Sequence, residues 1–373
     1  MTSPRILFVS PTAPDDRSYG GALRSNVLLQ ALRNCGDVTT LVLTPGNANR
    51  FVPHPAPGVP ASITFRHAFF PWPQRSLSAV RKMIRAALED RSFDLVVVRY
   101  LLLGLYVRPC VDAPFILDAD DLSKRHAKES APPLRRAVAA GRKLARDTVT
   151  RLGLPRYSHV WFVNEADMAT FRVASGSMLP NITPVVSMRP RPEPGPPTVL
   201  FVGNLEYGPN VQAVEYFVEH CWPDIHRVMP SARLQIVGKR SGENGKRWSA
   251  VAGVGSPGFV DDIMAEYACA SLVIAPVFSG GGTQIKVLEA LAHACAVVVS
   301  DFVCSGFKPK LEEGVHFLVA RTPAEWAASC IGLMQGKARA HALGKAGQEA
   351  VRHHYSPDSV ARSVAATVAA LLK

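Results

Sequence analysis

The chain has 373 residues, of which 47% are hydrophobic and 19% are charged. These values are typical of a soluble globular protein with room for two domains, and they exclude a largely disordered chain. The formal net charge is +12, and the excess is almost entirely N-terminal: residues 1–195 hold 26 Lys and Arg against 15 Asp and Glu, whereas the remainder holds 16 against 15. Such a basic half suits nucleic acid, an anionic membrane face or a phosphorylated acceptor, or it serves solubility alone.

No apolar run reaches the roughly 18–20 residues that span a bilayer, and the first apolar segment, residues 5–10, is too short for a signal peptide. We therefore expect a cytoplasmic protein. The seven cysteines are scattered without a Cys-x-x-Cys pair, and we expect them to be reduced packing residues.

The N-terminal half shows short apolar runs separated by helical or loop material. Residues 5–10 predict a buried strand, and after a loop rich in Pro and Asp, Gly20 and Gly21 begin an amphipathic helix that continues to residue 32. Further strands are predicted at residues 38–43, 93–98, 114–118 and 159–163, the last of them closing this half. Continuous apolar strands of this kind favour a parallel sheet covered on both faces.

An interdomain linker is predicted at residues 188–197, because five prolines in ten positions exclude a helix or a central strand. The strand and helix pattern then restarts. Strands are predicted at residues 198–203, 232–238, 271–276 and 297–300, and helices at about 210–228, at 263–269, from 323 onward and at 357–372. This pattern indicates a second doubly wound domain followed by a helical tail.

Three glycines, Gly280, Gly281 and Gly282, come shortly before a predicted helix that carries Glu289 on its second turn. Glycine lets the backbone approach a ligand closely, and the first helical N–H groups have no intrahelical partner, so the segment suits a diphosphate. Glu289 offers two acceptor oxygens to a ribose diol, and Lys286 lies within reach of phosphate. A glycine-rich turn with a solvated Glu and Lys is the simpler alternative.

An ordered series of short motifs runs through residues 199–320, and a looser series lies on either side of it. The motifs are Val202-Gly203, Pro209-Asn210, Trp222-Pro223, residues 230–238 and 258–262, the glycine segment, Gly20-Gly21 with Arg24, Pro180-Asn181 and Tyr355-Ser356. Taken in order, they resemble the retaining, nucleotide-sugar-dependent glycosyltransferases of the GT-B fold, specifically family 4 (group 1).

The resemblance implies an α/β protein in which two Rossmann-like doubly wound domains face each other across a cleft. Its parts are an acceptor-side domain at residues 1–188, a Pro-rich linker at 189–197, a donor domain at 198–355 and a crossover helix at 356–373 that packs on the first domain. Glu289 is then the carboxylate that contacts the nucleotide ribose. The donor-binding residues implied are Gly20, Gly21, Gly203, Asn204, Lys239, Gly280, Gly281, Gly282, Thr283, Gln284 and Glu289.

The chain departs from the family pattern where charge is expected beside the donor. Gly281 stands where many relatives carry a glutamate near the transferred sugar, and Asn204 and Pro209 stand where many carry an Arg and a Lys that bind phosphate. The need for positive charge makes Lys286 our candidate for a catalytic cation. The second choices are Lys239 and Arg240.

Three carboxylates, Asp118, Asp120 and Asp121, follow a strand at the place where many relatives carry a His near the sugar. Because the carboxyl ends of parallel strands face a ligand crevice, we name Asp120 and Asp121 as candidate catalytic residues that orient an acceptor hydroxyl or a sugar. The structural alternative is that Asp121 caps the next turn and Asp118 pairs with Arg125. Arg24 is our candidate acceptor contact, with an exposed helical Arg as the alternative.

The resemblance implies transfer of a sugar from a nucleoside-diphosphate sugar to an acceptor hydroxyl with retention of configuration, in bacterial polysaccharide or glycoconjugate synthesis. The resemblance implies that no bound metal is needed. No cofactor is predicted, because the nucleotide sugar is a substrate. The expected partners are a glycan or lipid-linked acceptor and, peripherally, the anionic inner face of a membrane, but not nucleic acid. The alternatives are a non-catalytic nucleotide-sugar-binding protein and a nucleotide-sugar epimerase.

Overall fold

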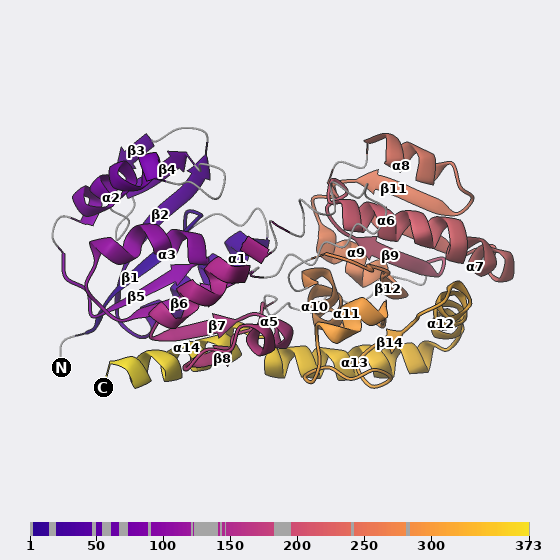
Figure 1. Ribbon diagram of the computed structural model, residues 1–373. Coiled ribbons are helices and arrows are strands. Elements are labelled where there is room, and N and C mark those ends of the chain that lie inside the picture. Colours follow the sequence, from indigo (N-terminus) through magenta and orange to yellow (C-terminus); the bar gives the residue numbers. More distant parts are fainter. Residues whose placement is uncertain are drawn as a thin grey trace. The chain divides into compact units, whose positions relative to one another are not determined.

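The chain divides into two compact units, each built around its own sheet (Figure 1). The first unit contains most of the chain up to Asn181 together with Pro357–Lys373, and the second contains Ile182–Ser356. The computed structural model describes residues 3–14, 20–46, 50–53, 61–66, 74–88, 91–120, 122, 141, 144–145, 147–182, 195–239, 242–280 and 284–372. The predicted linker at 188–197 lies mostly outside this set. Both units are α/β with parallel sheets, which confirms the predicted pair of Rossmann-like domains.

The described part of the first unit contains an eight-stranded sheet in the order β3-β4-β2-β1-β5-β6-β7-β8. Its strands are β1 Arg5–Ser10, β2 Asp37–Gly46, β3 Arg50–Pro53, β4 Ala61–Arg66, β5 Leu95–Arg99, β6 Phe115–Ala119, β7 His159–Phe162 and β8 Gly176–Met178. Neighbours are parallel except β3 and β4. The prediction that β7 ends this half is wrong, because β8 pairs beyond it through main-chain groups without an apolar run of its own.

Helices cover both faces of the first sheet. They are α1 Gly20–Arg33, α2 Gln74–Leu88, α3 Leu101–Val107, α5 Glu165–Thr170 and α14 Pro357–Leu371. Side chains alternate along a strand, so Val160 and Phe162 of β7 join the core cluster formed with α2 and α3, whereas Trp161 points to the other face. There its indole Nε1 donates to Thr367 Oγ1 of α14 at 3.2 Å. Figure 1 shows α14, in yellow, lying beside this sheet.

The basic helix α2 packs on the core of the first unit. Val80 and Ile84 are fully buried in the cluster that it forms with the sheet. Its arginines Arg81 and Arg85 donate from Nη2 to the carbonyls of Leu105, at 3.3 Å, and Pro109, at 3.0 Å. Within the described ranges, no helix combines the length and the hydropathy needed to cross a membrane.

The described part of the second unit contains a six-stranded parallel sheet in the order β11-β10-β9-β12-β13-β14. Its strands are β9 Thr198–Val202, β10 Arg233–Val237, β11 Val254–Gly258, β12 Leu272–Ala275, β13 Val297–Val299 and β14 Leu318–Val319. Its helices are α6 Gly208–Tyr216, α7 Trp222–Val228, α8 Gly242–Ser249, α9 Ile263–Cys269, α10 Ile285–Ala292, α11 Asp301–Ser305, α12 Pro323–Gln335 and α13 Lys337–His354.

The predicted helix at 210–228 is two helices joined by a π-helical turn, Phe217–Cys221. Pro223 lies in the first turn of α7, where the lack of an N–H is tolerated, and it therefore marks a new helix start inside the apolar pattern. Helix α9, in contrast, has the predicted bounds. The Oδ1 of Asp262 caps it by accepting from Ala265 N at 3.2 Å.

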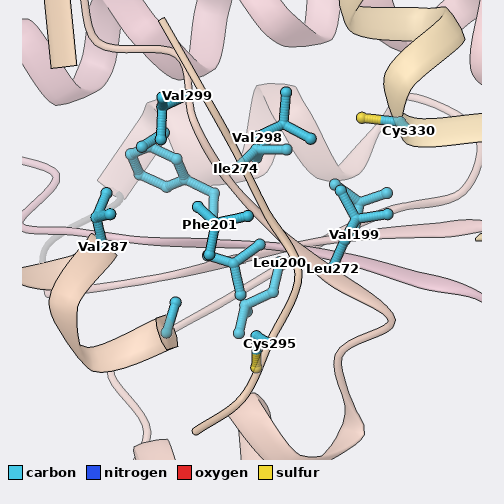
Figure 2. Packing of buried hydrophobic residues seen from close by; sticks show 14 of the residues in the cluster. Val199, Leu200, Phe201, Leu272, Ile274, Val287, Cys295, Val298, Val299 and Cys330 are labelled. Atoms are coloured by element: carbon cyan, nitrogen blue, oxygen red, sulfur yellow. The ribbon is translucent and has the colours of Figure 1, made fainter. Parts of the chain in front are cut away.

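The core of the second unit is formed by the central strands and α10. Figure 2 shows Phe201 of β9 and Val299 of β13 close together, with Val287 of α10 beside them; all three are at most 1% exposed. Cys295 and Cys330 are buried in the same cluster as free thiols. This core fixes β9, which leads into Gly203 and Asn204, and α10, which carries Glu289.

Candidate functional site

The loops that follow β9 and β10 meet at the carboxyl edge of the second sheet. A Cβ at Gly238 would lie 1.7 Å from the carbonyl oxygen of Gly203, so glycine is required for this close approach. Leu205 N also donates to Lys239 O at 3.1 Å. Asn204 and Lys239 are exposed on these loops. Because ligands of open parallel sheets bind at this edge, the two loops form one side of the candidate site.

The start of α10 lies beside the same edge, after β12. Gly280 has φ of +129°, in the region that favours glycine, and a Cβ there would lie 2.8 Å from the Tyr207 hydroxyl. Gln284 is the N-cap residue, and no described side chain caps α10 through a hydrogen bond. The predicted residues Gly281, Gly282 and Thr283 lie outside the described residues.

Lys286 is buried beneath the loop that follows β9. Its Nζ donates to Asn210 Oδ1 at 2.6 Å and lies 4.6 Å from the centroid of the Phe201 ring. Asn210 Nδ2 in turn donates to the carbonyl of Asn204 at 2.9 Å. Burial lowers the pKa of Lys286 to about 7, against the opposing charge of Glu289. The buried lysine is therefore held by a neutral amide, Asn210, which also binds the loop that follows β9.

Glu289 lies one turn after Lys286 on α10 and is partly buried. The Tyr267 hydroxyl donates to its Oε2 at 3.1 Å, and the Tyr267 ring stacks on His293 with the ring centroids 4.8 Å apart. Burial raises the pKa of Glu289, although the Tyr267 hydrogen bond and the Lys286 charge oppose this rise. The carboxylate is oriented by one neutral donor, so it can accept hydrogen bonds from a bound polyol.

The other predicted cations of this edge have different surroundings. The Nζ of the exposed Lys239 lies 5.2 Å from the centroid of the Phe259 ring. Arg240 lies outside the described residues. Lys286 is therefore buried beside α6, whereas Lys239 is exposed on the loop that follows β10.

In the first unit, the carboxyl edge of the sheet holds a buried ion network of Arg24, Arg99, Asp118 and Asp120. Asp118 is 0% exposed and accepts from Arg24 Nε at 3.0 Å and from Arg99 Nε at 3.0 Å. Burial would raise the pKa of Asp118, but the charges of Arg24 and Arg99 outweigh burial and lower it. Arg99 also binds Asp120 Oδ2 from Nη2 at 2.7 Å. Two guanidinium groups and two carboxylates thus balance each other's charge.

Arg24 is a buried member of this network, so the alternative of an exposed helical Arg is wrong. Its side chain is 4% exposed. Besides Asp118, it donates to the carbonyls of Leu179 and Pro180, at 2.9 Å each, and to Asn181 Oδ1 at 3.2 Å. These contacts tie α1 to the end of the first unit, and the predicted acceptor contact of Arg24 stays a prediction.

Asp118 pairs with Arg24 and Arg99, whereas Arg125, its predicted alternative partner, lies outside the described residues, as does Asp121. Asp120 is described and is 12% exposed. Gly21 lies in the first turn of α1, and its carbonyl accepts from Arg99 Nη1. Gly20 is the first residue of that helix. The structure therefore places Asp120 and the two glycines at one edge.

The sequence did not point to Arg99 or Tyr267, which position the predicted residues. Arg99 has a signal in the sequence, because it is a charge that ends the apolar run of β5. Tyr267 has none, since its contact with α10 joins residues 22 positions apart. Asn210 belongs to the Pro209-Asn210 motif, but its contact with Lys286, 76 positions away, could not be derived from the motif. Among the described residues, no three His, Cys, Asp or Glu side chains form a group that could hold a metal ion.

Comparison with known proteins identifies a family for part of the second unit. Residues 196–336 match the profile of the family described as Glycosyl transferases group 1. This segment contains β9 to α12, and thus Asn204, Lys286 and Glu289. No curated protein sequence gives a significant match.

Solved structures resemble the chain over nearly its full length. Sucrose-phosphate synthase from Thermosynechococcus elongatus has a TM-score of 0.74 at 16% identity, covering 99% of both chains. A glycosyltransferase from Rickettsia africae has a TM-score of 0.69 at 12% identity, covering 100% of both. HepE from Anabaena, in complex with UDP-glucose, has a TM-score of 0.61 at 14% identity, covering 98% of this chain and 100% of that one. At these identities the likeness shows the fold.

Proposed function

We propose that the protein is a glycosyltransferase that moves a sugar from a nucleoside-diphosphate sugar to an acceptor hydroxyl. The observation that carries the proposal is the arrangement on α10: its start, Lys286 and Glu289 lie at the carboxyl edge of a parallel sheet, within the segment that matches group 1 glycosyltransferases.

The donor is proposed to bind along α10. Glu289 accepts from the ribose hydroxyls while the Tyr267 hydroxyl holds its Oε2. The diphosphate lies at the start of the helix, where the glycine segment and the first-turn amides provide donors and the positive end of the helix dipole. Asn204 and Lys239, on the adjoining loops, complete the donor contacts.

Lys286 is proposed to stabilise the charge that develops on the leaving diphosphate. An anion beside its buried ammonium favours the protonated form, so binding of the donor raises the fraction of Lys286 that is charged. Preorganised charge of this kind acts on the transition state without rearrangement. We propose that no metal is required, and unchanged turnover after treatment with EDTA is the expected result.

The reaction is proposed to retain the anomeric configuration by attack on the same face of the sugar. The acceptor oxygen bonds to the anomeric carbon, the bond from that carbon to the phosphate oxygen breaks, and the leaving phosphate takes the acceptor proton. NMR of the product would show the configuration of the donor. A trapped covalent sugar adduct on a carboxylate of the enzyme would contradict this path.

UDP-glucose is the first donor to test, because the HepE structure contains it. We propose that the acceptor is a bacterial glycan or a lipid-linked molecule. It is proposed to bind at the carboxyl edge of the first sheet, beside Asp120. The assay incubates the protein with UDP-glucose and a panel of alkyl glycosides, and detects UDP release and the glycoside product by mass spectrometry. Other nucleotide sugars follow in the same format.

The matched variants are Glu289→Gln and Glu243→Gln, the latter on α8 with a side chain that is 88% exposed. Charged hydrogen bonds contribute about 1.5–3 kcal/mol, so Glu289→Gln is expected to weaken donor binding about 10–100-fold while Glu243→Gln has no effect. Donor binding without turnover would favour the non-catalytic alternative, and sugar conversion without an acceptor would favour an epimerase.

A further inference from the structure

Arg99 occupies a different position in the buried ion network from Arg24. Arg24 directs its donors to Asp118 and to residues 179–181, which are all buried. Arg99 uses only Nε for Asp118. Its two remaining nitrogens point to two different parts of the edge, so one rigid guanidinium joins elements that are far apart in the sequence.

One of these nitrogens holds the first turn of α1. Arg99 Nη1 donates to the carbonyl of Gly21 and, at 2.7 Å, to Ser25 Oγ. Ser25 Oγ also accepts from the hydroxyls of Ser10, at 3.0 Å, and Thr12, at 3.2 Å. The helix start that carries the glycine pair is therefore anchored to Arg99 and to the end of β1.

The other nitrogen holds Asp120. Arg99 Nη2 donates to Asp120 Oδ2 at 2.7 Å, and the Tyr100 hydroxyl lies 3.4 Å from the same oxygen. The second oxygen, Oδ1, has no hydrogen-bond partner among the described residues, and the Asp120 side chain is 12% exposed. Within the described part of the chain, one carboxylate oxygen is thus held by the protein and the other accepts no hydrogen bond.

Tyr100 supports this arrangement from the end of β5. It is a non-glycine residue with φ of +64° and ψ of 135°, which L side chains rarely adopt. The guanidinium carbon of Arg99 lies 4.8 Å from its ring centroid. Strained backbone persists where the surroundings hold it in place, and such positions cluster at functional sites.

We propose that Arg99 is a positioning residue that aims Asp120 Oδ1 at a hydroxyl of the glycosyl acceptor while it anchors the start of α1. This inference rests on the proposed glycosyl transfer and adds the acceptor side of the reaction. A carboxylate oxygen accepts hydrogen bonds from hydroxyl groups, so the ligand proposed at Asp120 is a polyol. Arg99 is itself buried, so it acts through the groups that it holds, among them Asp120 and Gly21.

The test uses Arg99→Lys and Asp120→Asn in the full chain, with UDP-glucose and the alkyl glycoside that the wild type glycosylates best. A lysine keeps the charge but cannot hold three partners in fixed directions. We expect both variants to lower kcat/KM for the acceptor at least tenfold, and we expect Asp120→Asn to change the Kd for UDP less than twofold. Arg5→Lys is the matched control, because Arg5 pairs with Asp94 at the opposite edge of the same sheet.

A double variant separates positioning from general loss of stability. If part of the effect of Arg99 passes through Asp120, the double variant lowers acceptor kcat/KM by less than the product of the two single effects. Fully multiplying effects, or a UDP Kd that weakens in Asp120→Asn in parallel with acceptor kcat/KM, would overturn the proposal.

A crystal structure of Arg99→Lys separates this proposal from the proposed function. We expect the Asp120 carboxylate and the Gly21 carbonyl to have moved from their wild-type positions. An unmoved pair would overturn the positioning role whether or not the wild type transfers sugar. If the wild type transfers no sugar to any acceptor, the proposed function fails, and a substrate role for Asp120 fails with it.

Discussion

The two units bury ionisable groups at equivalent edges of their sheets, yet they treat the charges in opposite ways. In the first unit, Arg24 and Asp118 face each other, and their pairing outweighs burial: the pKa of Asp118 is lowered and that of Arg24 is raised. In the second unit, the hydrogen-bond partners that the described residues offer to Lys286 and Glu289 are neutral, and burial lowers the pKa of the first to about 7 and raises that of the second.

The difference indicates that the edge of the first sheet keeps its charges fixed, whereas the edge of the second sheet can respond to a ligand. A balanced network keeps its protonation over a wide pH range and resists change. A buried lysine that titrates near neutral pH responds strongly to an arriving anion. The proposed roles follow: the first unit presents a rigid acceptor edge, and the second holds the donor diphosphate.

The largest expected effect comes from breaking the balanced network. Asp118→Asn removes one of the two carboxylates that balance the two buried guanidinium groups. We therefore expect the free energy of unfolding to fall by about 3–5 kcal/mol. Urea denaturation measures the change. Asp94→Asn, whose side chain is 41% exposed, is the control and should lose much less, because solvent screens its ion pair with Arg5. Equal losses in the two variants would contradict the comparison.

Lys286→Met tests the lowered pKa of this buried lysine through the pH dependence of the free energy of unfolding. Between pH 7 and the ordinary pKa of 10.5, the unfolded chain holds a proton that the folded chain has released. Unfolding therefore takes up a proton, and this group makes the free energy of unfolding rise with pH by up to about 1.4 kcal/mol per pH unit. From pH 7.5 to 9.5, wild type should gain about 2 kcal/mol relative to the variant. Parallel pH profiles would show that Lys286 titrates normally.

Gly280→Ala probes the turn before α10. The added Cβ meets the Tyr207 hydroxyl, and φ of +129° strains any L side chain, so we expect a loss of about 1–2 kcal/mol in thermal unfolding and weaker nucleotide binding. Gly208→Ala is the matched control, because a Cβ there meets no atom within 4 Å. A Gly280→Ala variant as stable as the wild type would contradict the predicted strain.

The smallest effect is expected for Tyr267→Phe, which removes the hydrogen bond to Glu289 Oε2. The loss is worth about 1 kcal/mol, or about fivefold in nucleotide Kd. Because that bond lowers the pKa of Glu289, its removal raises this pKa further, and the loss of affinity should be greater at pH 5.5 than at pH 8. A loss that does not depend on pH would indicate that Tyr267 acts only by packing.

Much of the fold could be predicted because the strands are continuous apolar runs and several helices begin at recognisable caps. Asp262 before α9 and Thr322 before α12 are such caps. The missed elements lack these signals: β8 has three residues and no apolar run, and the turn at Phe217–Cys221 lies within an unbroken apolar pattern.

Site residues that are close together in the sequence could be predicted. Contacts between residues far apart in the sequence could not. Gly280 and Glu289 belong to one segment, so their spacing indicates a ligand. Arg24 and Asp118 are 94 positions apart, and their pairing exists only after the sheet forms. Their burial therefore could not be derived from the pattern of α1 alone.

The most direct test of the account is a calorimetric titration with UDP, GDP, ADP and TDP on wild type, Glu289→Gln and Glu243→Gln. The account predicts that one nucleotide binds the wild type and the Glu243→Gln variant equally, and binds Glu289→Gln about 10–100-fold more weakly. Absence of binding by all four nucleotides, or equal binding by all three proteins, would contradict a donor site on α10.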